Sequence, residues 1–314
     1  MPKSLSPIIL FAFNRPDHTL RTLESLARNI LANESTLIVY ADGPKFESSD
    51  ETLRRIENTR QIIRSKKWCK DVILHESNEN KGLAKSVIQG VSEVLSNNDS
   101  AIVLEDDLEL SSNFLVYMNE ALQTYRYEES IFSVSGYRYP LLKEVDFKED
   151  VFLFPRASTW GWGTWKNRWF KAEWDLNPTD RIVSDKETQK QFNRGGDDMS
   201  GMLIDSIIGK NQSWGIKWCY SHFKNNAYGL FPRYSLLKNI GIDGSGEHCK
   251  PSDIDFGIIE GEDKEFSFPK KLSPNASIIN SLRLFFAQEE PAPIKYSLKF
   301  FFQRIKRRLL RTFA

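Results

Sequence analysis

Three adjacent carboxylates, Glu105-Asp106-Asp107, directly follow an apolar run. Neighbouring negative charges repel one another, so they need either water or a shared cation. Carboxylate oxygens are the ligands that Mg²⁺ and Mn²⁺ prefer in proteins, and either ion can also bind a diphosphate. The triplet therefore predicts a divalent-cation site. The alternative is a solvated acidic turn that leads into a helix capped at Ser111 or Ser112.

The elements that must position this triplet are predicted to form an α/β fold. Short apolar runs that predict strands alternate with segments of helical periodicity, the strands at 7–13, 36–41, 71–75 and 100–104 and the helices near 20–27, 50–66 and 82–95. This alternation is typical of a parallel sheet, whose ligands lie outside the carboxyl ends of the strands. We therefore expect one crevice lined by Asn14-Arg15, Asp42-Gly43, Asn78–Lys81 and Glu105–Asp107.

The second half of the chain is less regular. It contains a helical pattern near 112–126, a possible strand at 130–136, a short helix at 198–209 and two weak strand patterns within 213–260. The aromatic stretch 160–165 spaces its indoles with glycines. Indole rings stack well on sugars and also fill cores, so both interpretations stay open for Trp160 and Trp162.

Four motifs together resemble the GT-A glycosyltransferases. They occur in the expected order and spacing, in the region Phe11–Leu23, in Tyr40-Ala-Asp-Gly43, in Asn80-Lys-Gly-Leu-Ala84 and in Leu104-Glu-Asp-Asp-Leu108. The chain most resembles the family 2 enzymes, well over about 1–125 and more loosely over 155–210. The acidic triplet and the residues after it also look like the N-acetylglucosaminyltransferase I family. The resemblance implies a GT-A, Rossmann-like α/β fold with a mixed, mainly parallel sheet flanked by helices.

The resemblance also implies which residues bind a nucleotide. Asn14 and Arg15 would border it, and Asp42 would contact the base or ribose. Gly82 would let the backbone approach the nucleotide, with Lys85 nearby.

Within the triplet, the resemblance implies that Asp107 holds the metal and that Asp106 faces the ribose or the metal. Most family 2 enzymes carry Asp-x-Asp or Asp-Asp at this point. This chain has Glu105 in front, so the ligand assignment among the three carboxylates stays open.

Inverting glycosyl transfer needs a second carboxylate, which takes the proton of the attacking hydroxyl. The best candidate is Asp198, with Asp197 beside it, after Gly195-Gly196 and before an apolar helix. The pair resembles the Glu-Asp motif of family 2, in which the Asp is the base. The alternative is that Asp198 only caps the helix.

A glycine-containing loop at 239–248 ends in His248. Such a loop fits a lid over the diphosphate. Some GT-A enzymes complete the metal shell with a histidine at such a position, so the resemblance makes His248 a candidate metal ligand.

Composition restricts the class of protein. The 314 residues carry a net charge of +1, which argues against nucleic acid as a partner. Three cysteines are too sparse for a disulfide framework and favour a reducing compartment. We find neither a secretory pattern nor a run long enough to span a bilayer, so the expected location is cytoplasmic.

The charge is unevenly distributed. Residues 295–314 hold seven Lys/Arg and no acid, whereas the other 294 residues hold 36 basic and 42 acidic side chains. Large apolar residues recur at helical spacing in this tail, at Leu298, Phe301, Phe302, Ile305, Leu309 and Phe313. The tail therefore predicts a basic amphipathic helix that lies on the anionic inner face of the cytoplasmic membrane. A helix docked on the domain, or one that contacts nucleic acid, would be the alternatives.

The predicted organisation is one GT-A domain over 1–260, with a nucleotide-binding half at 1–107 and an acceptor and catalytic half at 108–260. Residues 261–294 form a linker or excursion, and 295–314 form the tail.

The predicted activity is metal-dependent, inverting transfer of a hexosyl-type sugar from a nucleotide-sugar, with a UDP-sugar favoured. The acceptor would be a sugar or glycolipid hydroxyl, as in surface-polysaccharide assembly. The alternatives are a nucleotidyltransferase and a non-catalytic GT-A-like domain that binds a sugar or a partner.

Overall fold

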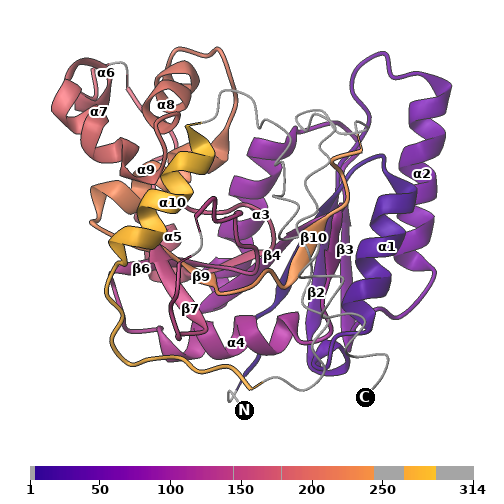
Figure 1. Cartoon of the computed structure of the whole chain (residues 1–314). Helices are drawn as coiled ribbons and strands as arrows, with labels where there is room; N and C mark the ends of the chain where they lie inside the picture. Colours follow the sequence, from indigo (N-terminus) through magenta and orange to yellow (C-terminus); the bar gives the residue numbers. More distant parts are fainter. Residues whose placement is uncertain (1–3, 144, 178, 244–264, 288–314) are drawn as a thin grey trace, which may run out of the picture.

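The structure is a computed structural model that describes residues 4–143, 145–177, 179–243 and 265–287 (Figure 1). The predicted tail and His248 lie outside the described residues. Every helix within the described ranges is too short or too polar to cross a membrane.

Eight strands of the described residues form one mixed sheet in the order β3-β2-β1-β4-β8-β6-β9-β7. They are β1 (Ile8–Ala12), β2 (Thr36–Ala41), β3 (Asp71–Glu76), β4 (Ser100–Glu105), β6 (Ile131–Ser135), β7 (Val151–Phe154), β8 (Trp162–Trp165) and β9 (Tyr228–Pro232). The first four are mutually parallel, and β8 runs antiparallel to β4. A separate antiparallel ribbon joins β5 (Leu108–Leu110) to β10 (Leu237–Asn239).

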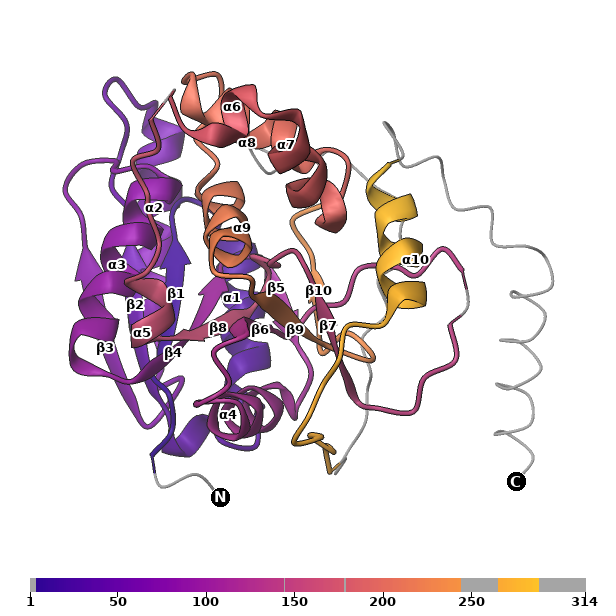
Figure 2. The ribbon, with the colours of Figure 1, turned by 90° about the vertical axis from the view of Figure 1, so that its left-hand side faces the viewer.

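Helices flank the sheet on both sides (Figures 1 and 2). They are α1 (Pro16–Ala27), α2 (Asp50–Arg64), α3 (Leu83–Asn97), α4 (Phe114–Thr124), α5 (Lys166–Trp169), α6 (Arg181–Ser184), α7 (Lys186–Phe192), α8 (Met199–Ile207), α9 (Trp214–Lys224) and α10 (Ala276–Phe286), with 3-10 turns η1 (Ala32–Glu34) and η2 (Asn193–Gly195). The predicted α/β class, with a mixed sheet flanked by helices, is confirmed.

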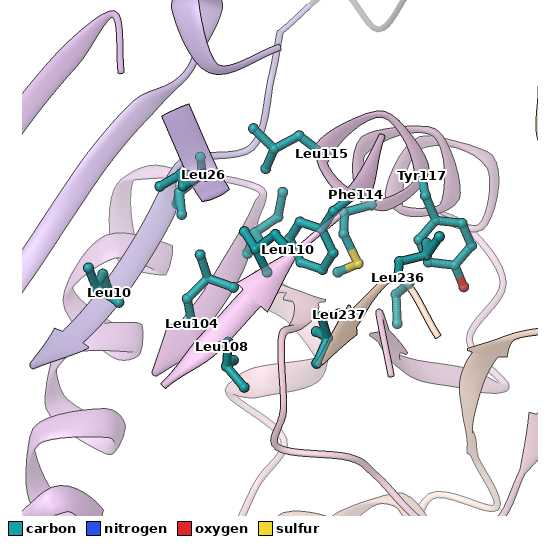
Figure 3. Close-up of a cluster of buried hydrophobic side chains, with 14 of the residues drawn as sticks. Leu10, Leu26, Leu104, Leu108, Leu110, Phe114, Leu115, Tyr117, Leu236 and Leu237 are labelled. Carbon is teal, nitrogen blue, oxygen red and sulfur yellow. The ribbon is translucent and has the colours of Figure 1, made fainter. Parts of the chain in front are cut away.

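Strand β1 shows why the strands in the first third of the sequence are continuous apolar runs. Ile8 and Leu10 face one core with side chains of α1, α2 and α4, while Ile9 and Phe11 face a second core with those of α3, α8 and α9. Both faces of a central parallel strand are buried, so polar residues have no place in it. Figure 3 shows part of the first core, in which Leu10, Leu26 and Phe114 come from different elements.

The register places the predicted turns at one edge. Phe11 pairs with both Tyr40 and Glu105, and Tyr40 pairs with His75. The carboxyl ends of β1, β2, β3 and β4 are therefore level, and the turns that follow them meet at that edge, as the sequence predicts.

One expectation for the second half is wrong. Residues 214–224, within a region of weak strand pattern, form helix α9 because Trp214, Ile216 and Trp218 to Tyr220 pack into the second core. One open alternative is decided, because Trp162 begins strand β8 in the middle of the sheet and is only 1% exposed, so it is a core residue and not a sugar platform. Trp160 is half-buried against Tyr137, with ring centroids 4.6 Å apart.

The region 261–294 includes a packed helix. Within its described part, 265–287, helix α10 buries Ile278 and Leu282 against Phe152, Phe154 and Phe231 of β7 and β9. The side chain of Asn275 caps this helix by accepting hydrogen bonds from the N–H groups of Ser277 and Ile278. The division of the chain into domains stays a prediction.

Candidate active site

The acidic triplet lies where the sequence places it, but it is not a solvated turn. Glu105 is the last residue of β4, and Asp106 and Asp107 connect it to β5. Asp106 and Asp107 are only 9% and 8% exposed. The solvated-turn alternative is therefore wrong.

The triplet holds more negative charge than its neighbours balance. Nη1 of Arg15 donates to Oδ2 of Asp107 at 2.7 Å, and the N–H of Phe13 donates to Oδ2 of Asp106 at 3.2 Å. Burial, followed by the charge of Asp107, raises the pKa of Asp106 to about 7 despite the opposing effect of Arg15. Burial and the other two carboxylates likewise raise the pKa of Glu105 well above its usual range. An added cation would relieve this excess.

Strand β10 and the residues after it, distant in the sequence, cover this turn. The β10–β5 ladder continues as a hydrogen bond from the N–H of Ile240 to the carbonyl of Asp107 at 2.8 Å. Gly241 then lies so close that a Cβ there would be 2.2 Å from Oδ2 of Asp107. Asp243 lies beside Nη2 of Arg15 at 3.8 Å and Nε2 of His18 at 3.1 Å. The sequence analysis missed His18, one turn after Arg15.

The other predicted nucleotide residues shape the same edge. The carboxylate of Asp42 accepts hydrogen bonds from the N–H groups of Gly43, Lys81 and Gly82, so it fastens the loop before α3 to the end of β2. Gly82 has φ +78, which favours glycine, and nothing lies within 4 Å of its Cβ position. Lys85 is exposed on α3.

Asn14 has a structural contact through its backbone. Its carbonyl accepts a hydrogen bond from Nε of Arg55 at 2.9 Å, which joins the turn after β1 to α2.

A cleft of about 420 Å³ lies between α3 and the ends of β2 and β3. Residues of these elements and of the loops next to them line it, among them Tyr40, Asp42, His75, Lys81 and Glu93. Tyr40 stacks on both Phe11 and His75 and donates a hydrogen bond to Glu93 at 3.1 Å. The cleft therefore borders the loop whose N–H groups donate to Asp42.

The second carboxylate pair is held by two arginines that the sequence analysis did not select. Asp198 occupies the N-cap position of α8 but makes no capping hydrogen bond. Its two oxygens instead accept from Nη1 and Nη2 of Arg156 at 2.8 and 2.9 Å. Asp197 accepts from Nη2 of Arg283 at 2.8 Å. Capping alone therefore does not explain Asp198.

One signal could have identified Arg156. A charged residue follows the apolar run Val151–Phe154 after a single proline, just as the acidic triplet follows its own strand. Polar residues at the end of a buried strand commonly line a site, and this rule selects both Arg156 and the acidic triplet.

Side chains of the described residues do not by themselves assemble a metal site. Among residues 4–143, 145–177, 179–243 and 265–287, no group of three or more His, Cys, Asp or Glu side chains is arranged to hold a metal ion.

The sequence of residues 8–176 matches the family described as Glycosyl transferase family 2. The chain belongs to glycosyl transferase family 2. The match assigns a glycosyltransferase domain to the chain, and the predicted resemblance to family 2 is confirmed. The likeness to the N-acetylglucosaminyltransferase I family stays a prediction.

Solved structures show low overall similarity to this family 2 chain. TarS of S. aureus aligns at 12% identity with a TM-score of 0.33, over 57% of this chain and 33% of that one. A UDP-glucose pyrophosphorylase complexed with UDP-glucose aligns at 12% identity with a TM-score of 0.36, over 73% of this chain and 91% of that one. A search of curated proteins gave no match.

Proposed function

We propose that this family 2 enzyme transfers a hexosyl-type sugar from a UDP-sugar to a hydroxyl acceptor with inversion at the anomeric carbon. The observation that carries the proposal is the pairing of two separate carboxylate centres. One is the buried Asp106-Asp107 turn at the carboxyl edge, and the other is Asp198, fixed by Arg156. Inverting transfer needs a cation-binding centre for the leaving group and a base for the acceptor.

The acidic turn fits a divalent cation that is shared with a diphosphate. Mg²⁺ is commonly bound by one or two protein carboxylates together with substrate phosphates, so no cage of three side chains is required. Asp107 is the proposed ligand, with Asp106, Glu105 and His248 as further candidates. When bound, Mn²⁺ or Mg²⁺ would neutralise the leaving diphosphate.

The protein's own residues would bind and orient the donor. Arg15 lies next to Asp107 and supplies a positive charge for a phosphate. Asp42 holds the loop that carries Gly82, and Asn14 lies at the adjacent turn. We propose that this edge binds the nucleotide, with Lys85 near it.

Asp198 is the proposed base. The two hydrogen bonds from Arg156 use one lone pair on each oxygen, so an oxygen can still accept the acceptor's proton. Asp197, paired with Arg283, is the alternative base.

The acceptor class rests on the charge of the tail. Seven basic residues without an acid suit an anionic leaflet, so we propose a glycolipid or surface-polysaccharide intermediate at the inner face of the cytoplasmic membrane.

The test of the base is Asp198→Asn, which keeps the shape of the side chain and removes its ability to accept a proton. We expect unchanged donor affinity and turnover lower by roughly 10²-fold or more. Asp205→Asn, on the exposed face of α8, is the matched control. A loss of less than a few-fold in Asp198→Asn would assign the base elsewhere.

A further inference from the structure

The carboxylate of Asp198 has a fixed orientation because Arg156 binds both of its oxygens. The two hydrogen bonds, of 2.8 and 2.9 Å, leave from the two terminal nitrogens of one planar guanidinium. A fork of this kind sets the plane of the carboxylate as well as its position. A lysine in the same place could supply the charge but not the plane.

Arg156 is itself held from its other side. The ring of Phe286 lies over the guanidinium, with 3.8 Å between its centroid and Cζ of Arg156. Phe286 in turn stacks on Phe154 at the end of β7, with their rings 14° from parallel. The Arg156 side chain is 12% exposed, so it is packed between the helix α10 and the loop that carries Asp198.

The loop is shaped to admit this pair. Gly196 has φ +148, and a Cβ at this position would lie 2.5 Å from Oδ1 of Asp198 and 2.6 Å from Nη1 of Arg156. A larger residue would displace one member of the pair. The glycine before the acidic pair therefore has a role that is separate from flexibility.

The charge of Arg156 is also maintained. Burial disfavours its charged form, but the hydrogen bonds and charge of Asp198 outweigh burial, so the pKa of Arg156 is raised. A buried arginine that stays charged and keeps a two-bond contact is suited to orienting a carboxylate rather than to exchanging protons itself.

We propose that Arg156 is a positioning residue for glycosyl transfer, which aligns Asp198 toward the acceptor hydroxyl, and that Phe286 of α10 fixes Arg156. This inference rests on the proposed role of Asp198 as the base. Helix α10 lies outside residues 8–176, which match family 2. The inference makes this helix part of the support of the active site.

The test compares Arg156→Lys and Phe286→Leu with Arg181→Met, which breaks an exposed ion pair to Asp185 outside the candidate site. Arg283→Met, which breaks the ion pair to Asp197 without touching Asp198, tests the alternative base. The probe is UDP release from UDP-glucose and from UDP-N-acetylglucosamine with Mn²⁺, measured together with melting temperature. We expect Arg156→Lys to lower kcat about tenfold or more with little change in the KM of the donor, Phe286→Leu to lower it less, and Arg181→Met to leave it within about twofold.

A double variant separates positioning from general packing. If Arg156 acts through Asp198, adding Arg156→Lys to Asp198→Asn should cause no further loss of kcat. The inference is overturned if the two substitutions lower kcat multiplicatively in the double variant, or if Arg156→Lys keeps full turnover. A fall in kcat in Arg283→Met but not in Arg156→Lys would also overturn it and would favour Asp197.

The same set distinguishes the two proposals. Normal turnover in Asp198→Asn refutes the base assignment, and this inference falls with it. A large loss in Asp198→Asn together with normal turnover in Arg156→Lys leaves the base in place and removes only the positioning role.

Discussion

At the scale of single residues, the main feature of the acidic turn after β4 is its charge. Asp106 and Asp107 are buried beside Glu105, and Arg15 is the cation that contacts Asp107 directly. Carboxylates this close need positive charge to remain ionised. The proposed cation would supply this charge and would share it with the diphosphate of the donor.

Replacement of Asp107 tests this coupling. In Asp107→Ala we expect Mn²⁺-dependent thermal stabilisation by UDP to disappear, because a ligand that binds only the folded state raises its melting temperature. The turn should persist, since its backbone bond to Ile240 does not use the side chain. Glu109→Ala, two residues on and paired with Arg21 at the surface, should keep the stabilisation. Retention of the Mn²⁺ effect in Asp107→Ala would remove Asp107 from the metal shell.

A second residue-scale feature is the buried His222. Its Nδ1–H donates to the carbonyl of Trp218 at 2.8 Å, because a carbonyl can only accept. Nε2 therefore accepts from the hydroxyl of Ser133 at 2.9 Å. Both ring nitrogens are satisfied by the neutral form, and burial lowers the pKa of His222 to about 4.

This burial predicts a pH dependence of stability. Between the ordinary pKa of 6.5 and about 4, the unfolded chain binds a proton at His222 that the folded chain does not. Stability should therefore fall as the pH drops through this window, by about 3 kcal/mol from this group. We expect His222→Gln to flatten that part of the profile in urea unfolding from pH 7 to 4. An unchanged slope relative to the wild type would contradict the assignment.

At the scale of elements, helix α10 connects the end of the described chain to the candidate active site. Its buried side attaches it to β7 and β9, and its last turn places Phe286 on Arg156. The packing of Ile278 and Leu282 therefore determines the position of a side chain that contacts the support of Asp198.

Two leucines of α10 give a matched pair. Leu282 is fully buried, so Leu282→Ala should lower the free energy of unfolding by about 2–5 kcal/mol. Leu284 is 42% exposed on the same helix, and Leu284→Ala should cost much less. Urea denaturation measures both. Equal effects would show that α10 is not held by its buried side, and a loss of turnover with Leu282→Ala alone would agree with the role of Phe286.

At the scale of the whole molecule, the tail and the rest of the chain carry net charges of opposite sign. Residues 295–314 carry seven basic side chains, while the remainder has six more acidic than basic ones. In the proposed membrane contact, each basic residue near an anionic leaflet would contribute roughly 1 kcal/mol, and the apolar residues of the tail would add burial among the headgroups.

Deletion of 295–314 tests the proposed membrane contact. We expect the truncated chain to lose co-sedimentation with phosphatidylserine vesicles and the full chain to lose it in high salt. Transfer to a soluble acceptor and the melting temperature should not change. A lower melting temperature with unchanged sedimentation would instead show that the tail packs on the domain.

Local pattern was enough to predict the first half of the molecule. Apolar runs broken by helical periodicity identified β1 to β4 and the helices between them, because each central strand is buried on both faces and each turn begins where burial ends. Parallel strands bring their carboxyl ends to one edge, so the convergence of Asn14, Asp42 and Glu105 followed from the order of elements alone.

The second half was decided by contacts between distant segments. Arg156 and Asp198 are 42 residues apart, Arg283 and Asp197 are 86 apart, and Asp243 reaches Arg15 from the segment after β10. Short helices and short strands such as β8 carry weak periodicity, so nothing local distinguishes the core residue Trp162 from a sugar platform or the helix α9 from a strand. The sequence by itself selected the carboxylates that are candidates for chemistry. Only the tertiary structure decided which cations hold them, because an ion pair forms where the path of the chain brings two charges together.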